Sequence, residues 1–142
     1  MNGTLNRYTH FVGRLLVSAI FVVTGFAKLT HWSGTAAFMA SKGMPAIPVL
    51  LAIAILFELG GGLAILVGYR TRLAALALSL HLVVATLVFH NFWAYPPAEQ
   101  QEQMIHFLKN LAILGGMLRL LSDGAGALSL DAGRLRASAS AR

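Results

Sequence analysis

Four long apolar runs are the feature that most limits what this chain can fold into. They cover residues 11–29, 47–67, 73–93 and 104–121. A bilayer core of about 30 Å needs about 20 residues of α-helix, at a rise of about 1.5 Å per residue. Backbone groups in lipid must be hydrogen-bonded within the segment or across a closed barrel. Because the runs do not alternate apolar and polar residues, we expect an all-α chain with four transmembrane helices.

The composition identifies the lipid bilayer as the main partner of the chain. Of the 142 residues, 57% are hydrophobic and 11% are charged, against about 45–50% and about 25% in soluble domains. A soluble domain of this length buries only about 68–70% of the surface that its unfolded chain exposes. The absence of cysteine excludes a disulfide framework and thiol–disulfide chemistry by this chain.

The basic residues indicate how the helices are oriented. The three lysines, Lys28, Lys42 and Lys109, fall on one side of the membrane, and all eight arginines fall on the other. By the positive-inside rule, both termini and the arginines are then cytoplasmic. The net charge of +6 does not predict a nucleic-acid partner, because the basic residues flank the apolar runs instead of forming a stripe. The arginines are Arg7, Arg14, Arg70, Arg72, Arg119, Arg134, Arg136 and Arg142.

The connections predict a compact antiparallel bundle. Residues 68–72 form a very short turn, so the second and third helices must be neighbours. Residues 30–46 are interpreted as a short amphipathic element at the membrane interface. We therefore expect a four-helix transmembrane domain over residues 1–121 and a flexible cytoplasmic tail over residues 122–142, which is rich in Gly, Ala, Ser and Arg.

Glu58 is the clearest candidate for a functional residue. It lies midway along the second apolar run, where an ionisable side chain costs about 2.5–3.5 kcal/mol on insertion scales. Gly60, Ala64 and Gly68 follow at four-residue spacing, which predicts a face that a neighbouring helix approaches closely. A functional carboxylate and a structural clamp between helices are equally compatible with this pattern.

The possible partners of Glu58 are placed in the half of the bundle that faces away from the cytoplasm. Lys28 ends the first run, His90 lies near the end of the third, and the fourth carries a polar sector early in its length. We expect a polar pocket here, formed by Lys28, Glu58, His90, His106, Lys109 and Asn110. The alternatives are lysines that extend to the headgroups and an interhelical hydrogen bond from Asn110. His81, at the depth of Glu58, could pair with it as a proton relay.

Several segments, in order along residues 14–131, together form one pattern. They are Gly25-Phe26-Ala27-Lys28, Glu58-Leu59-Gly60-Gly61-Gly62-Leu63-Ala64, Phe89-His90, Phe107-Leu108-Lys109-Asn110-Leu111 with Gly115-Gly116, and Asp123-Gly124-Ala125-Gly126 leading to Leu128-Ser129-Leu130-Asp131. The chain thereby resembles the DoxX family of small bacterial membrane proteins. The resemblance implies a multi-pass protein of the bacterial inner membrane with a link to redox metabolism. His81 lies outside this pattern, which favours His90 as the functional histidine.

Three functions follow from these residues and from the resemblance. The first is a redox-associated subunit that binds a quinone, with Glu58, His90 and Lys109 as candidate catalytic residues. Its electrons come from a membrane or peripheral redox partner, because the sequence carries no flavin, haem or cluster motif. The second is a non-enzymatic membrane scaffold, and the third is a carrier of protons or small solutes, which would favour a homo-oligomer. No metal site is expected, since the chain lacks cysteine.

Overall fold

A computed structural model of the protein describes residues 3–134, and within this range the regular elements are helices with no strand. Four helical stretches are long and apolar enough to cross a membrane: Thr4–Thr30, Ile47–Val67, Thr71–Ala94 and Pro97–Asp123. The prediction of an all-α chain with four spans is therefore confirmed. The first and last helices extend beyond their predicted edges because polar residues continue the helix past the apolar run.

The second span is a single rod built from three consecutive elements. The α-helices α3 (Ile47–Ile55) and α4 (Gly62–Val67) flank a π-helical segment, η1 (Leu56–Gly61). The other elements are α1 (Gly3–Thr30), α2 (Trp32–Ser41), α5 (Thr71–Phe89), the 3₁₀ turn η2 (Phe92–Ala94) and α6 (Pro97–Asp123). As predicted, one short element, α2, separates the first two spans, but its apolar residues do not gather on one face, so the expected amphipathic character is absent.

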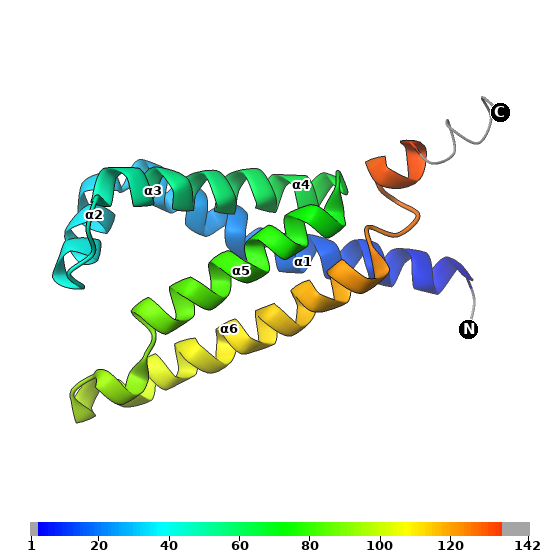
Figure 1. Cartoon of the computed structure of the whole chain (residues 1–142). Coiled ribbons are helices and arrows are strands. Elements are labelled where there is room, and N and C mark those ends of the chain that lie inside the picture. Colours follow the sequence, from blue (N-terminus) through cyan, green and yellow to red (C-terminus); the bar gives the residue numbers. More distant parts are fainter. Residues whose placement is uncertain (1–2, 135–142) are drawn as a thin grey trace.

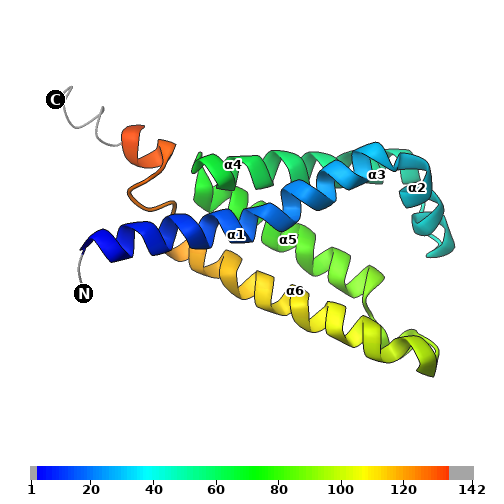
Figure 2. The same ribbon diagram turned by 180° about the vertical axis from the view of Figure 1, so that it is seen from behind.

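The spans pack as an antiparallel bundle (Figures 1 and 2). The first span packs along the second, α5 packs along α6, and α5 also contacts η1 and α4. The start of α1 and the described segment that follows α6 lie at one end of the bundle, which we call the arginine end. The end that carries α2 and η2 is called the lysine end. The buried core contains Phe21, Ile65, Leu78 and Met117, whereas many other large apolar side chains face outward, where lipid would surround them.

The short turn between the second and third spans is confirmed, and Gly68 makes it possible. This residue ends α4 with a φ of +71°, a left-handed conformation that glycine adopts without the steric cost of a side chain. A Cβ atom here would also collide with Ser129 of the C-terminal segment. The turn therefore needs glycine both for its backbone conformation and for close packing.

Residues 124–134 differ from the flexible tail expected to begin at residue 122. The helix α6 continues to Asp123, and the chain then folds back over the arginine end. Arg14 in α1 is only 2% exposed and donates hydrogen bonds to the carbonyl oxygens of Ala125 and Leu128. A buried guanidinium needs such acceptors. The hydrogen bonds of Arg14 therefore hold residues 124–134 in place, although their composition alone indicates flexibility. Residues 135–142, the rest of the predicted tail, lie outside the described residues.

Asp131 fixes the same segment to the start of α5. Its carboxylate accepts hydrogen bonds from the backbone N–H groups of Arg70, at 2.8 Å, and Thr71, at 2.9 Å. Its own N–H donates to the carbonyl oxygen of Gly68 at 2.9 Å. No residue next to α5 caps the helix through its side chain, so Asp131 acts as a cap supplied from a distant part of the sequence.

We expect Asp131→Ala to lower the free energy of unfolding by about 1 kcal/mol at neutral pH, as loss of an N-cap does. Burial raises the pKa of Asp131, but the hydrogen bonds from Thr71 and Arg70 outweigh it and leave the pKa below its ordinary value. The stabilisation is thus complete above the unfolded pKa of about 3.9. It is lost as the pH falls through the lower folded pKa. Denaturation in detergent, followed by circular dichroism across this pH range, measures the free energies of unfolding of the wild type and of Asp131→Ala. The two values should converge in acid; a difference that stays constant with pH would contradict the prediction.

Candidate functional site

Glu58 lies in the π-helical segment of the second span. Its side chain is buried, with 6% of the residue exposed. Single π-turns inside α-helices are uncommon and are frequent at functional sites. A buried carboxylate in this position requires partners that compensate for its loss of water, and the neighbouring helices provide them.

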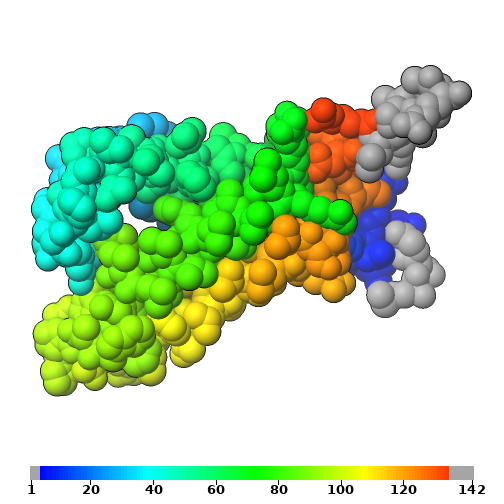
Figure 3. Space-filling model, viewed as in Figure 1, coloured from blue at the N-terminus to red at the C-terminus, as the bar shows by residue number. Residues whose placement is uncertain are grey.

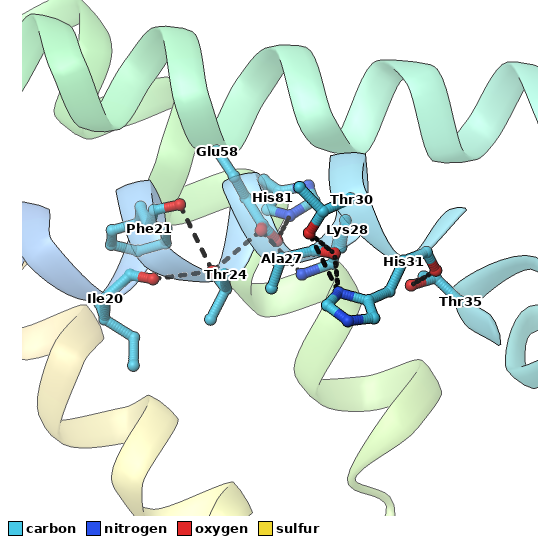
Figure 4. Close-up of polar contacts among 10 residues, drawn as sticks. All are labelled: Ile20, Phe21, Thr24, Ala27, Lys28, Thr30, His31, Thr35, Glu58 and His81. Carbon is cyan, nitrogen blue, oxygen red and sulfur yellow. Dashed lines mark hydrogen bonds and ion pairs between the residues drawn. The ribbon is translucent and has the colours of Figure 1, made fainter. Parts of the chain in front are cut away.

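Three side chains surround the carboxylate of Glu58 (Figure 4). The Lys28 Nζ lies 2.7 Å and the Thr24 Oγ1 lies 2.9 Å from Oε2, both from α1. The His81 Nε2 of α5 lies 3.0 Å from Oε1. We call Thr24, Lys28, Glu58 and His81 the Glu58 cluster. It joins three helical segments through one carboxylate, and its amine and imidazole can both exchange protons.

His81 is the residue that sequence reasoning ranked too low. Its pairing with Glu58 was predicted from depth in the membrane, but the family resemblance favoured His90. In the structure, His81 contacts the carboxylate directly, and its ring stacks on Phe57 with 6.0 Å between centroids. Thr24 was not predicted at all. Its position one helical turn before Lys28, on the same face of α1, was the signal that could have identified it.

Glycines let α1 approach the second span closely enough to form the cluster. A Cβ atom at Gly25 would lie 2.9 Å from the backbone nitrogen of Leu59, and one at Gly62 would lie 3.1 Å from that of Val22. Of the predicted Gly60–Ala64–Gly68 face, Gly60 is exposed and meets only its own helix, whereas Ala64 packs on the core and Gly68 packs closely against Ser129 and Arg14. A π-helical turn contains more residues than the 3.6 of an α-helical turn, so the π-segment changes which residues of the second span share a face.

The remaining predicted site residues form a second group near the lysine end. The His90 Nδ1 lies 2.9 Å from the Gln103 Oε1, and the rings of His90 and His106 are 5.1 Å apart. Lys109 follows, with its Nζ 3.2 Å from the His106 Nδ1. No hydrogen bond within residues 3–134 joins this group to the Glu58 cluster. A single pocket that contains both the Glu58 cluster and this second group stays a prediction.

Asn110 has a structural contact instead of a place in either group. Its side-chain amide is buried and donates to the Thr86 hydroxyl of α5 at 3.0 Å. This is the interhelical hydrogen bond considered as its alternative role.

Among the described residues, no three side chains of the metal-binding types lie together. The His106 Nε2 lies 3.8 Å from the Oε1 of Glu102, which is four residues earlier on α6.

Comparison with known proteins decides the family. The DoxX family model matches residues 9–91. The chain is also 38% identical to the inner membrane protein YqjF of Escherichia coli over 120 residues, which cover 84% of this chain and 87% of the relative. The chain belongs to the DoxX family. It is accordingly a multi-pass protein of the inner membrane, as the resemblance implied.

Two further relatives extend the comparison. The inner membrane protein YphA of Escherichia coli is 35% identical over 121 residues, covering 84% of this chain and 86% of the relative. The ER-derived vesicles protein ERV29 of Saccharomyces cerevisiae is 28% identical over 130 residues, which are 92% of this chain but 35% of that protein. No solved structure matches the chain.

Proposed function

We propose that this DoxX-family protein is a redox-associated membrane subunit that binds a quinone-class ligand beside the Glu58 cluster. The observation that carries the proposal is a buried carboxylate held by an amine and an imidazole within the spans. Ionisable side chains within transmembrane segments are rare, and they typically mark pathways of protons or substrates. The cluster has the chemistry that a lipid-soluble proton acceptor requires.

The exposed parts of the cluster support a ligand with carbonyl oxygens. The side chains of Lys28 and His81 are 28% and 18% exposed, so both are partly accessible from outside the bundle. Phe57, stacked on His81, is 38% exposed and offers an aromatic surface at the same place. The molecular surface is hollowed between α2–α3 and α5, in the half of the bundle that contains Lys28 (Figure 3). A quinone head group can accept hydrogen bonds there and stack on an aromatic ring.

Proton exchange is the chemical role of the cluster in this proposal. A quinone that gains two electrons takes up two protons to become a quinol. A redox partner protein supplies the electrons, and Lys28, His81 and Glu58 deliver protons from one hydrogen-bonded group. The chain then acts as the membrane-embedded, proton-exchanging part of a larger redox assembly.

The test is binding of a short-chain ubiquinone analogue to the purified protein in detergent, followed by tryptophan fluorescence. We expect saturable binding that weakens about tenfold or more in Lys28→Met, since each 1.4 kcal/mol corresponds to about tenfold in affinity. Lys42→Met is the matched control, because Lys42 donates a hydrogen bond to the Tyr95 hydroxyl and belongs to neither group. Absence of saturable binding, or equal affinity in both variants, would refute the proposal.

One observation favours a scaffold as the second candidate function. Both oxygens of the Glu58 carboxylate already have partners, and these partners come from two neighbouring helices. A clamp of this kind holds helices together without any ligand. If the protein is a scaffold, Glu58→Gln reduces the yield of folded protein, and neither the wild type nor the variant binds the quinone analogue. If it is a redox subunit, the Glu58→Gln protein that folds binds the quinone analogue more weakly than the wild type does.

A further inference from the structure

The arginine end contains a cavity that the proposed function does not use. It has a volume of about 490 Å³ and lies between α1, α6 and the turn that follows α6. Asn6, Arg7 and His10 line it from α1, Arg119 and Asp123 line it from α6, and residues 126–127 line it from the turn; it is open to the outside. The volume falls within the range of about 300–1,000 Å³ that is usual for ligand sites.

The charges of this arginine-end cavity suit an anion. Arg7 and Arg119 bring guanidinium groups from two different helices, and Asn6 and His10 add neutral or basic donors. Asp123 is the single acidic residue of the lining, and it forms an ion pair with Arg119 in which the Arg119 Nε lies 2.8 Å from the Asp123 Oδ2. A guanidinium has five N–H donors, so this ion pair leaves donors of Arg119 for a ligand. Planar guanidinium groups bind phosphate oxygens through paired hydrogen bonds.

The wall of the cavity is held in place by the contacts of Arg14. Its hydrogen bonds to Ala125 and Leu128 fix the turn that contains residues 126–127. Gly126 has a φ of +76° and approaches His10 so closely that a Cβ atom would lie 3.1 Å from the His10 Cβ. The cavity is therefore formed by rigid contacts before any ligand arrives, which reduces the entropic cost of binding.

We propose that this cavity binds the phosphate of an anionic phospholipid headgroup. Arg7 lies near the first residues of the first span and Arg119 near the last of the fourth, which is the depth of the headgroups. The helix surfaces beside these arginines carry exposed Leu5, Phe11 and Leu118, along which acyl chains can lie. Basic pockets between transmembrane helices bind anionic lipid headgroups in this manner. A soluble phosphate would make no use of the apolar surface.

The experiment compares retained lipid in the full-length protein. The protein is reconstituted in mixed phosphatidylcholine and phosphatidylglycerol vesicles, extracted in mild detergent, and analysed by native mass spectrometry. We expect one phosphatidylglycerol per chain, bound about tenfold more weakly when both arginines are changed in Arg7→Gln/Arg119→Gln. The matched control is Arg70→Gln/Arg134→Gln, which removes two positive charges at the same end of the bundle but outside this cavity. Its affinity for phosphatidylglycerol should stay within about twofold of that of the wild type, since a tenfold change corresponds to about 1.4 kcal/mol.

The single variant Arg7→Gln covers the case in which loss of the Arg119–Asp123 pair disturbs folding. Within residues 3–134, Arg7 forms no ion pair, so this variant should keep its melting temperature and still bind phosphatidylglycerol more weakly. Equal loss in the control variant would show nonspecific attraction to a basic surface and would overturn the proposal. So would displacement of the lipid by inorganic phosphate alone, since it would identify a site for the free ion.

Discussion

The Glu58→Ala variant is expected to lose about 3–5 kcal/mol of unfolding free energy, the usual cost of removing one partner of a buried ion pair. Without the carboxylate, Lys28 and His81 remain in the bundle with no acceptor at the centre of the cluster. The contacts between the first, second and third spans at this depth lose their common partner. Chemical denaturation in mixed micelles, followed by circular dichroism, measures the loss.

Glu99→Ala is the matched control for this prediction. Glu99 is an exposed carboxylate in the first turn of α6, so its loss should cost no more than about 1 kcal/mol through the helix dipole. If Glu58→Ala and Glu99→Ala had equal free energies of unfolding, the Glu58 cluster would not stabilise the fold, and the prediction would be contradicted.

Arg14→Ala should also destabilise the protein strongly, by about 3 kcal/mol or more. Its guanidinium donates to two backbone carbonyls of the C-terminal segment, and hydrogen bonds that involve a charged group contribute about 1.5–3 kcal/mol each. We expect residues 124–134 to detach from the arginine end. Limited digestion with trypsin should then cleave after Arg134 much faster than in the wild type.

Arg72→Ala separates this effect from a general loss of charge. Arg72 is exposed and donates to the carbonyl oxygen of Ser122, so its removal should cost less than about 1 kcal/mol. Its rate of cleavage after Arg134 should match that of the wild type. Equal cleavage in Arg14→Ala and Arg72→Ala would mean that Arg14 does not hold the segment.

The spans and the central carboxylate could be predicted from sequence because the membrane imposes simple rules. Length and hydrophobicity define a helix that crosses lipid, and these rules identified all four spans. The cost of burying a charge singled out Glu58. The same cost required a partner for Glu58, and Lys28 was among the candidates because it ends the first apolar run in the half of the bundle that faces away from the cytoplasm.

The details of the cluster depend on tertiary contacts that no local pattern records. The π-turn at η1 changes the packing face, so Gly62 and not Gly60 meets α1. His81, and not His90, contacts the Glu58 carboxylate. The C-terminal segment was expected to be flexible because its Gly, Ser and Arg content indicates a loop. Its order comes from Arg14, more than 100 residues away along the chain.

A double-mutant cycle on Lys28 and Glu58 tests the central claim most directly. Lys28→Met, Glu58→Gln and the double variant are unfolded alongside the wild type under one set of micelle conditions. The 2.7 Å ion pair predicts a coupling free energy of at least about 1 kcal/mol, as residues in direct contact show. Effects that add to within about 0.3–0.5 kcal/mol, as for distant sites, would contradict the pairing on which the Glu58 cluster rests.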